Sequence, residues 1–331
     1  MEFTAKYFNP SERGGTVLEE GVVAFRRATQ AAARDPSALY LYPRRTILAV
    51  NIALAANRPL LIFGEPGSGK TTLARNAAAV LGWSYYQDTI TSRTQAMDLL
   101  YTFDTLGRLN DATDPAAELR PRRAYIRPGT LWWAFNPRTA VWRGLDEWSD
   151  GFAPADPVID RRGEQRAVVL LDEIDKADPD VPNDLLEPFD RRTFPVADAE
   201  NAVIPSVRDV LLILTTNGER DLPPAFLRRC VTLKLDEPTA DWYVRIAEQR
   251  YGPDQTGLFR TVADEVMRLR GEARSRNLRR PGTAEFLDAI EACRHLDIRT
   301  SQDAWIELAA SVLWKNERIE IPPSSKDQAP A

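Results

Sequence analysis

The chain has 331 residues, of which 44% are hydrophobic and 27% are charged, and its formal net charge is −5. This composition is typical of a globular protein with one large or two ordinary domains, and no apolar stretch is long enough to cross a bilayer. Two cysteines do not make a disulfide framework, and a single histidine argues against a site built from several histidine ligands. The negative charge argues against general coating of nucleic acid. Because no apolar leader follows Met1, we expect a cytoplasmic protein.

The first 36 residues carry no chemical motif. Apolar residues between Val17 and Ala33 favour an amphipathic helix, so we expect a helical N-terminal extension over residues 1–36. A second helix is predicted from Thr46 to Ala56. It leads into the apolar run from Pro59 to Phe63, which has the character of a buried strand.

A glycine-rich run follows that strand and opens a predicted helix from Thr71 to Leu81, which ends at Gly82. The run fits G-x-x-x-x-G-K-[ST], a loop whose backbone N–H groups turn toward phosphate oxygens. Lys70 would reach the β- and γ-phosphates, and the Thr71 hydroxyl would bind Mg²⁺. The alternative is a glycine-rich turn without a nucleotide. The expected nucleotide-binding residues are Gly64, Glu65, Pro66, Gly67, Ser68, Gly69, Lys70, Thr71 and Thr72.

A long polar segment separates the next two predicted strands. The first of these strands runs from Trp83 to Asp88, and the polar segment extends from about residue 91 to residue 166. Because a structureless loop of this length is uncommon in a compact domain, the segment must carry its own elements. Its aromatic side chains, notably Trp132 and Trp133, either pack within the segment or contact a binding partner.

Two acidic residues stand at the end of the following strand. The apolar run from Ala167 to Leu171 is typical of a buried parallel strand, and Asp172 and Glu173 come directly after it. Open parallel sheets bind ligands at the carboxyl ends of their strands. Asp172 can hold Mg²⁺ there, and Glu173 can polarise an attacking water. Without the phosphate loop, a solvated acidic turn would be an equally good interpretation.

A polar residue also follows the next apolar strand, which is predicted from Val210 to Thr215. Asn217 lies at its tip, where an amide can orient the attacking water without carrying a charge. The pair Asn217-Gly218 also favours a turn, which is the alternative interpretation. A shorter, alternating strand is predicted from Cys230 to Leu235.

Two pairs of arginines lie beside later elements. Arg228 and Arg229 end a short predicted helix just before the last strand, where an arginine can reach a neighbouring subunit's nucleotide. The alternative is that these arginines only stabilise the C-terminal end of the helix by interacting with its dipole. Arg279 and Arg280 precede Pro281, at the start of a predicted helix. An arginine there can report the nucleotide state, and a solvated basic turn is the alternative.

The sequence changes character after Leu235, where helical periodicity continues without any strand signal. The strands and helices before this point alternate, which predicts a parallel α/β sheet. We therefore expect four parts. They are the extension 1–36, an α/β nucleotide-binding domain 37–235 with its insert at about 91–166, a helical domain 236–321 and a disordered tail 322–331.

In this order, the phosphate loop, the acidic pair, the strand-tip asparagine and the two arginine pairs resemble the motifs of an AAA+ ATPase. The resemblance implies a P-loop NTPase fold in which helices flank a five-stranded parallel sheet and an all-helical lid domain follows. It implies ATP and Mg²⁺ as ligands. It also implies Walker B at Asp172 and Glu173, sensor 1 at Asn217, an arginine finger at Arg229 (alternatively Arg228) and sensor 2 at Arg280 (alternatively Arg279).

Among AAA+ proteins the chain resembles the MoxR branch. The resemblance lies in Gly64-Glu65-Pro66-Gly67 and in the insert sequence Arg127-Pro128-Gly129-Thr130. The chain departs from the MoxR pattern after Asn217, where Gly218 stands in place of a frequent proline. The resemblance implies a ring of identical subunits, usually a hexamer, that hydrolyses ATP to remodel a partner protein. That partner often carries a von Willebrand factor A-type domain.

Two other functions are consistent with the motifs. A McrB-like nucleic-acid motor, or a subunit of a bacterial defence system, has a similar architecture, although the net charge of −5 counts against nucleic-acid binding. A nucleotide switch with little turnover is the other alternative. The presence of both Glu173 and Asn217 counts against it.

Overall fold

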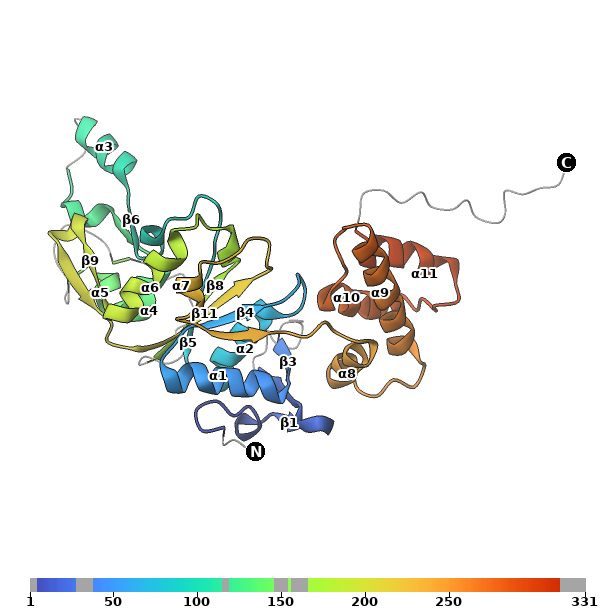
Figure 1. Ribbon diagram of the computed structural model, residues 1–331. Helices are drawn as coiled ribbons and strands as arrows, with labels where there is room; N and C mark the ends of the chain where they lie inside the picture. The colour runs from blue at the N-terminus through green and yellow to red at the C-terminus, as the bar shows by residue number, and fades with distance from the viewer. Residues whose placement is uncertain (1–4, 28–37, 115–118, 146–153, 156–165, 316–331) are drawn as a thin grey trace. The chain divides into compact units, whose positions relative to one another are not determined.

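The computed structural model describes residues 5–27, 38–114, 119–145, 154–155 and 166–315 of the chain (Figure 1). The chain divides into two compact units. The first comprises residues 1–65 and 70–236, and the second comprises residues 66–69 and 237–331. The first unit contains the β-sheets, and the second is helical in its described part.

A five-stranded sheet with the strand order β12-β4-β11-β8-β5 forms the centre of the first unit. Every pair of neighbouring strands is parallel, so the carboxyl ends of all five strands lie at one edge. This confirms the five-stranded parallel sheet that the sequence resemblance implies. The strands are β4 (Leu60–Phe63), β5 (Ser84–Thr89), β8 (Arg166–Asp172), β11 (Asp209–Thr216) and β12 (Val231–Lys234).

Helices cover both faces of this sheet. Successive side chains of a strand point to opposite faces, so Val168 and Leu170 pack with α1 (Arg44–Ala56) and α2 (Lys70–Leu81). Val169 and Leu171 pack on the other face, with α4 (Thr130–Phe135) and α6 (Val181–Arg191). Burial on both faces explains why the strands are continuous apolar runs rather than alternating ones.

The N-terminal segment forms strands rather than the predicted helix. In it, β1 (Thr16–Val17), β2 (Val23–Arg26) and β3 (Leu39–Tyr42) form an antiparallel sheet. Gly21 has φ 72°, and the next four residues, 22–25, are all buried, which suits a strand and not an amphipathic helix. The helix predicted from Val17 to Ala33 is therefore wrong as far as residue 26, and residues 28–37 lie outside the described part.

The insert carries its own elements, as expected from its length. The strands β6 (Tyr101–Phe103) and β7 (Ile126–Pro128) pair antiparallel, and the helices are α3 (Thr105–Thr113), α4 and α5 (Pro137–Val141). A hairpin of β9 (Thr193–Val196) and β10 (Ala202–Pro205), which the sequence pattern does not predict, packs beside α4.

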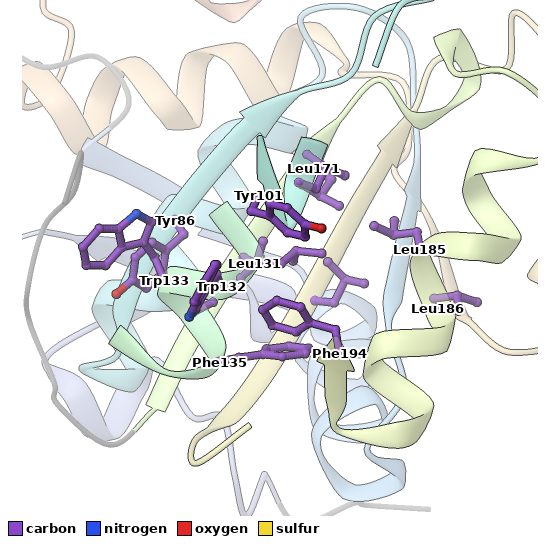
Figure 2. Close-up of a cluster of buried hydrophobic side chains, with 14 of the residues drawn as sticks. Tyr86, Tyr101, Leu131, Trp132, Trp133, Phe135, Leu171, Leu185, Leu186 and Phe194 are labelled. Carbon is purple, nitrogen blue, oxygen red and sulfur yellow. The ribbon is translucent and has the colours of Figure 1, made fainter. Parts of the chain in front are cut away.

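The two tryptophans of α4 are core residues. Figure 2 shows Trp132 beside Tyr101 and Phe194. The ring centroid of Trp132 lies 6.3 Å from that of Tyr101 and 5.5 Å from that of Phe194. Trp132 is fully buried and Trp133 is 4% exposed, while the Trp132 indole Nε1 donates to Thr139 Oγ1 at 3.0 Å. Of the two interpretations of these aromatics, packing is correct and contact with a partner is not, because both rings are buried. Their core is not confined to the insert, since it includes Phe194 of β9.

The last helix of the first unit is α7 (Pro224–Leu227). The second unit contains α8 (Ala240–Tyr251), α9 (Leu258–Ser275), α10 (Thr283–His295) and α11 (Asp303–Leu308). These helices share a core of their own, and the expected tail 322–331 lies outside the described residues. None of the described helices combines the length and the hydropathy that crossing a membrane requires.

Candidate nucleotide-binding site

Three neighbouring strands bring the predicted site residues to one edge of the sheet. The phosphate loop follows β4, the acidic pair begins with the last residue of β8, and Asn217 follows β11 directly. The register places Leu214 of β11 opposite Leu171 of β8, and Thr216 opposite Phe63 of β4. The three strand ends are therefore nearly level, and residues far apart in the sequence meet there.

Lys70 is buried, and its ammonium group donates three hydrogen bonds. Its acceptors are the carbonyl oxygens of Gly64 (2.6 Å) and Glu65 (3.0 Å), and Oδ1 of Asn217 (2.7 Å). Burial lowers the pKa of Lys70, although the negative charges of Asp172 and Asp175 oppose that shift. The lysine thus links the phosphate loop to the tip of β11.

Thr71 and Asp172 form the second link across this edge. Thr71 Oγ1 donates to Asp172 Oδ2 at 2.7 Å, while the Thr215 hydroxyl donates to Asp172 Oδ1. The same Thr215 oxygen accepts a hydrogen bond from the Glu173 N–H at 3.0 Å. Hydroxyl and carboxylate oxygens are the ligands that Mg²⁺ prefers, so Thr71 and Asp172 are suited to hold this ion.

Glu173 is held by hydrogen bonds at both carboxylate oxygens. Its φ of 62° turns the chain sharply after β8 and separates its side chain from that of Asp172. Lys176 Nζ lies 2.6 Å from Glu173 Oε2, and Asn217 Nδ2 lies 3.3 Å from Oε1. The carboxylate of Glu173 raises the pKa of Lys176, chiefly through this hydrogen bond.

Three further residues support the site, although the sequence motifs assign them no role. Thr215 and Lys176 contact the acidic pair as described. Asp175 is buried, and its Oδ2 accepts hydrogen bonds from the backbone N–H groups of Asn217 (3.2 Å) and Glu219 (3.0 Å). The sequence signal for Thr215 is its place at the end of an apolar strand, two residues before Asn217.

The conformation of the phosphate loop suits an anion. Gly67 and Gly69 have φ of 77° and 89°, a region that residues with a side chain rarely adopt. The Ser68 Oγ is buried without a hydrogen-bond partner among the described residues. The loop leads into the first turn of α2, where backbone N–H groups have no partner within the helix. These features fit a bound triphosphate.

Within the first unit, Arg228 and Arg229 do not lie at this edge of the sheet. Arg229 lies two residues before Val231, the first residue of β12, and Val231 lies opposite Leu60 at the start of β4. Arg229 therefore lies at the amino edge, opposite to Asp172. Its side chain is 51% exposed and lies 3.7 Å from Asp190, and Arg228 is also exposed. In the second unit, Arg279 pairs with Glu285 at 2.6 Å, and Arg280 lies three residues before Thr283, the first residue of α10.

In this five-stranded parallel sheet the phosphate loop follows β4, and the acidic pair stands at the end of β8, with β11 between the two strands. This arrangement defines a P-loop NTPase of the AAA+ type. Residues 59–230, more than half of the chain, match the family described as AAA domain (dynein-related subfamily). The chain therefore belongs to this family of AAA+ proteins.

The chain is also similar to longer curated proteins. It is 30% identical over 286 residues to the peroxisomal Lon protease homolog 2 of Spinacia oleracea, a match that covers 79% of this chain and 27% of that protein. It is 30% identical over 224 residues to the Lon protease of Syntrophus aciditrophicus (strain SB). This match covers 65% of this chain and 23% of that protein. The chain thus spans about a quarter of the length of these relatives. A solved structure of a RuvB mutant from Thermogota maritima is similar with a TM-score of 0.42 and 14% identity, over 80% of this chain and 66% of that one.

Proposed function

We propose that the chain is a MoxR-like AAA+ ATPase, which binds and hydrolyses Mg-ATP in a ring oligomer to remodel or activate a partner protein. The observation that carries the proposal is the arrangement at the carboxyl edge of the sheet. Thr71 lies 2.7 Å from Asp172, and Lys70 is bonded to Asn217, which in turn contacts Glu173. These are the groups that hydrolysis of a nucleoside triphosphate needs, and they lie at or after the carboxyl ends of three separate strands.

Each residue has a role that follows from its place. Lys70 would exchange its bonds to the loop carbonyls for phosphate oxygens. Thr71 and Asp172 would hold Mg²⁺, an ion that neutralises charge on the phosphates. Glu173 would accept the proton of the attacking water, and the amide of Asn217, which already contacts Glu173, would orient that water.

The position of Arg229 supports assembly. Its side chain is exposed and lies at the amino edge of the sheet, whereas the phosphate loop and the acidic pair of the same chain lie at the carboxyl edge. It would instead complete the site of a neighbouring subunit and stabilise charge in the transition state. A hexameric ring and a partner with a von Willebrand factor A-type domain follow from the MoxR resemblance. Arg280 would act as sensor 2 of the same subunit.

The test is multiple-turnover ATP hydrolysis by the full chain with Mg²⁺, measured against protein concentration. We expect the rate per subunit to rise as the protein assembles. Glu173→Gln should lower kcat by about 100-fold or more while ATP still binds, and Lys70→Ala should lose ATP binding. A rate no higher than that of Lys70→Ala contradicts the ATPase. A rate per subunit that is constant from dilute monomer upward contradicts completion by a neighbour.

A further inference from the structure

A polar hollow lies at the amino edge of the sheet, away from the phosphate loop. It has a volume of about 180 Å³ and is lined by residues before β4, in α4, at the end of α6 and around the start of β11. Its apolar floor includes Phe135 and Leu212, which are 1% and 2% exposed. Arginines contribute most of its charge.

Arg208 is the buried one of the three arginines that line this hollow. It is 9% exposed, and its Nη1 is buried without a hydrogen-bond partner among the described residues. Burying an arginine in this way is costly unless an anion compensates its charge. The segment around it is well anchored, because its carbonyl oxygen accepts hydrogen bonds from Arg192 (2.8 Å) and Ser206 (3.0 Å).

The other charges around the hollow do not neutralise Arg208. Arg58 and Arg192 stand at the exposed rim and add two positive charges. Among the described residues, the lining contains one carboxylate, that of Asp190, which lies 3.7 Å from Arg229 outside the hollow. Arg192 is 3.8 Å from Asp209, a separation at which an exposed pair contributes little.

A larger hollow of about 460 Å³ adjoins this one and shares Asn57, Arg58, Arg192 and Val210 with it. Its lining adds three positively charged residues, Lys6, Arg13 and Arg166, and two negatively charged ones, Glu12 and Asp209. The two hollows therefore form a continuous positively charged surface in a chain whose net charge is −5. Such a surface attracts anions toward the buried arginine.

We propose that the hollow around Arg208 binds a carboxylate carried on a short aliphatic chain. The guanidinium groups of Arg208 and Arg192 suit a carboxylate, since arginine pairs with it in a planar, two-bonded geometry. The floor of Phe135 and Leu212 suits methylene groups rather than a fully hydrated ion such as phosphate. The natural source is an acidic side chain or a free C-terminus of a protein partner. The site is separate from the phosphate loop, so the proposal does not depend on ATP hydrolysis.

The test is calorimetric titration of the full chain with glutarate and, separately, with inorganic phosphate, both at constant ionic strength. We expect glutarate to bind at one site per chain and more tightly than phosphate. Arg208→Gln should weaken glutarate binding by about tenfold or more, because it removes a charge-assisted hydrogen bond. Arg191→Gln changes an exposed arginine that is paired with Glu187, so it should leave binding unchanged. Lys70→Ala should also leave glutarate binding unchanged.

A circular dichroism melt shows whether Arg208→Gln is folded. If it is not, Arg58→Gln at the exposed rim replaces it, with an expected weakening of about threefold. Two blocked tripeptides then separate the sources, one with an acidic side chain and an amidated end, the other with only a free C-terminal carboxylate. The peptide that binds identifies the source. Failure of glutarate to bind, equal binding by Arg208→Gln in its folded form, or phosphate binding as tightly as glutarate overturns the proposal.

Discussion

Lys176 Nζ lies 2.6 Å from Glu173 Oε2, so the proposed catalytic base is held by a cation from the turn that follows its own strand. The two residues are three positions apart, and the φ of 62° at Glu173 brings the side chains together. Because Asn217 Nδ2 contacts the other carboxylate oxygen, the orientation of Glu173 is fixed from two sides.

The first prediction concerns this pair. Lys176→Met should lower kcat by about tenfold with little change in KM, because a base that has lost one of its two contacts spends less time aligned with the attacking water. Steady-state ATP hydrolysis measures both constants. Lys176→Arg should keep most of the rate, and Lys234→Met, on the exposed side of β12, should keep all of it. A faster Lys176→Met protein would instead show that the pair restrains Glu173.

The second prediction concerns Thr215, which is fully buried and contacts both acidic residues. Thr215→Val keeps the shape of the side chain but leaves the Glu173 N–H without its acceptor. It should destabilise the protein by about 1–3 kcal/mol and raise the Mg²⁺ concentration needed for half-maximal ATPase activity. Urea denaturation and Mg²⁺ titration of the rate measure the two effects.

Thr216→Val is the matched control for Thr215→Val. Thr216 is also buried, but its hydroxyl accepts from the Gly218 N–H at 2.9 Å and not from Glu173. We expect a comparable loss of stability without a change in the Mg²⁺ dependence. The same Mg²⁺ dependence in both variants would mean that Thr215 does not position Asp172.

Much of the sheet and of the candidate site follows from local sequence. The strands β4, β8 and β11 are predictable because burial on both faces makes each a continuous apolar run. Once parallel strands are assumed, the residues at their carboxyl ends must meet at one edge. This is how Lys70, Asp172 and Asn217 can be expected together from positions up to 147 residues apart.

Other features depend on pairing that the sequence pattern does not contain. Strand β2 is a strand because Ala24 pairs with Leu41, a partner beyond the range of helical or alternating periodicity. The β9–β10 hairpin contains Pro195 and Pro205, and proline disfavours a strand in any prediction from local propensity. The contact between Lys176 and Glu173 depends on one positive φ, which no pattern of residue types specifies.

The third prediction concerns the core of the insert. Trp132→Phe should destabilise the protein by about 1–2 kcal/mol, because it removes part of a filled core and leaves Thr139 Oγ1 without its indole donor. Trp132→Ala should cost about 3–5 kcal/mol. Urea denaturation measures both. Leu106→Ala on α3, where the side chain is 73% exposed, should change stability by no more than about 0.5 kcal/mol. A Trp132→Ala protein of wild-type stability would contradict the packing assignment.

The fourth prediction is a pH dependence at Lys70. Because burial lowers its pKa in the folded protein, the unfolded chain binds more protons between that lowered pKa and the ordinary value of 10.5. Stability therefore gains from this group as the pH rises through that interval. The free energy of unfolding of the wild type minus that of Lys70→Met should increase from pH 8 to pH 10.5. Urea denaturation of the nucleotide-free proteins measures the difference. A constant or falling difference contradicts the desolvation of Lys70.

The fifth prediction decides whether Arg229 acts on a neighbouring subunit. Arg229→Ala and Glu173→Gln should each lower kcat by about 100-fold or more when assayed alone, since one lacks the transition-state cation and the other the base. Each variant still carries the group that the other lacks. An equal mixture should therefore recover activity at those interfaces where an intact Glu173 meets an intact Arg229, about a quarter of them for random mixing in a symmetric ring.

Arg191→Ala removes an exposed arginine that is bonded to Glu187 in its own helix, so it should retain the wild-type rate and controls for loss of surface charge. Arg228→Ala, assayed in the same mixture, shows which of the two adjacent arginines is the finger. If Arg229 acted within its own subunit, mixing would restore nothing, because every active site would lack either its base or its arginine. Full activity of Arg229→Ala alone, with loss of activity in Arg228→Ala, would transfer the role to Arg228.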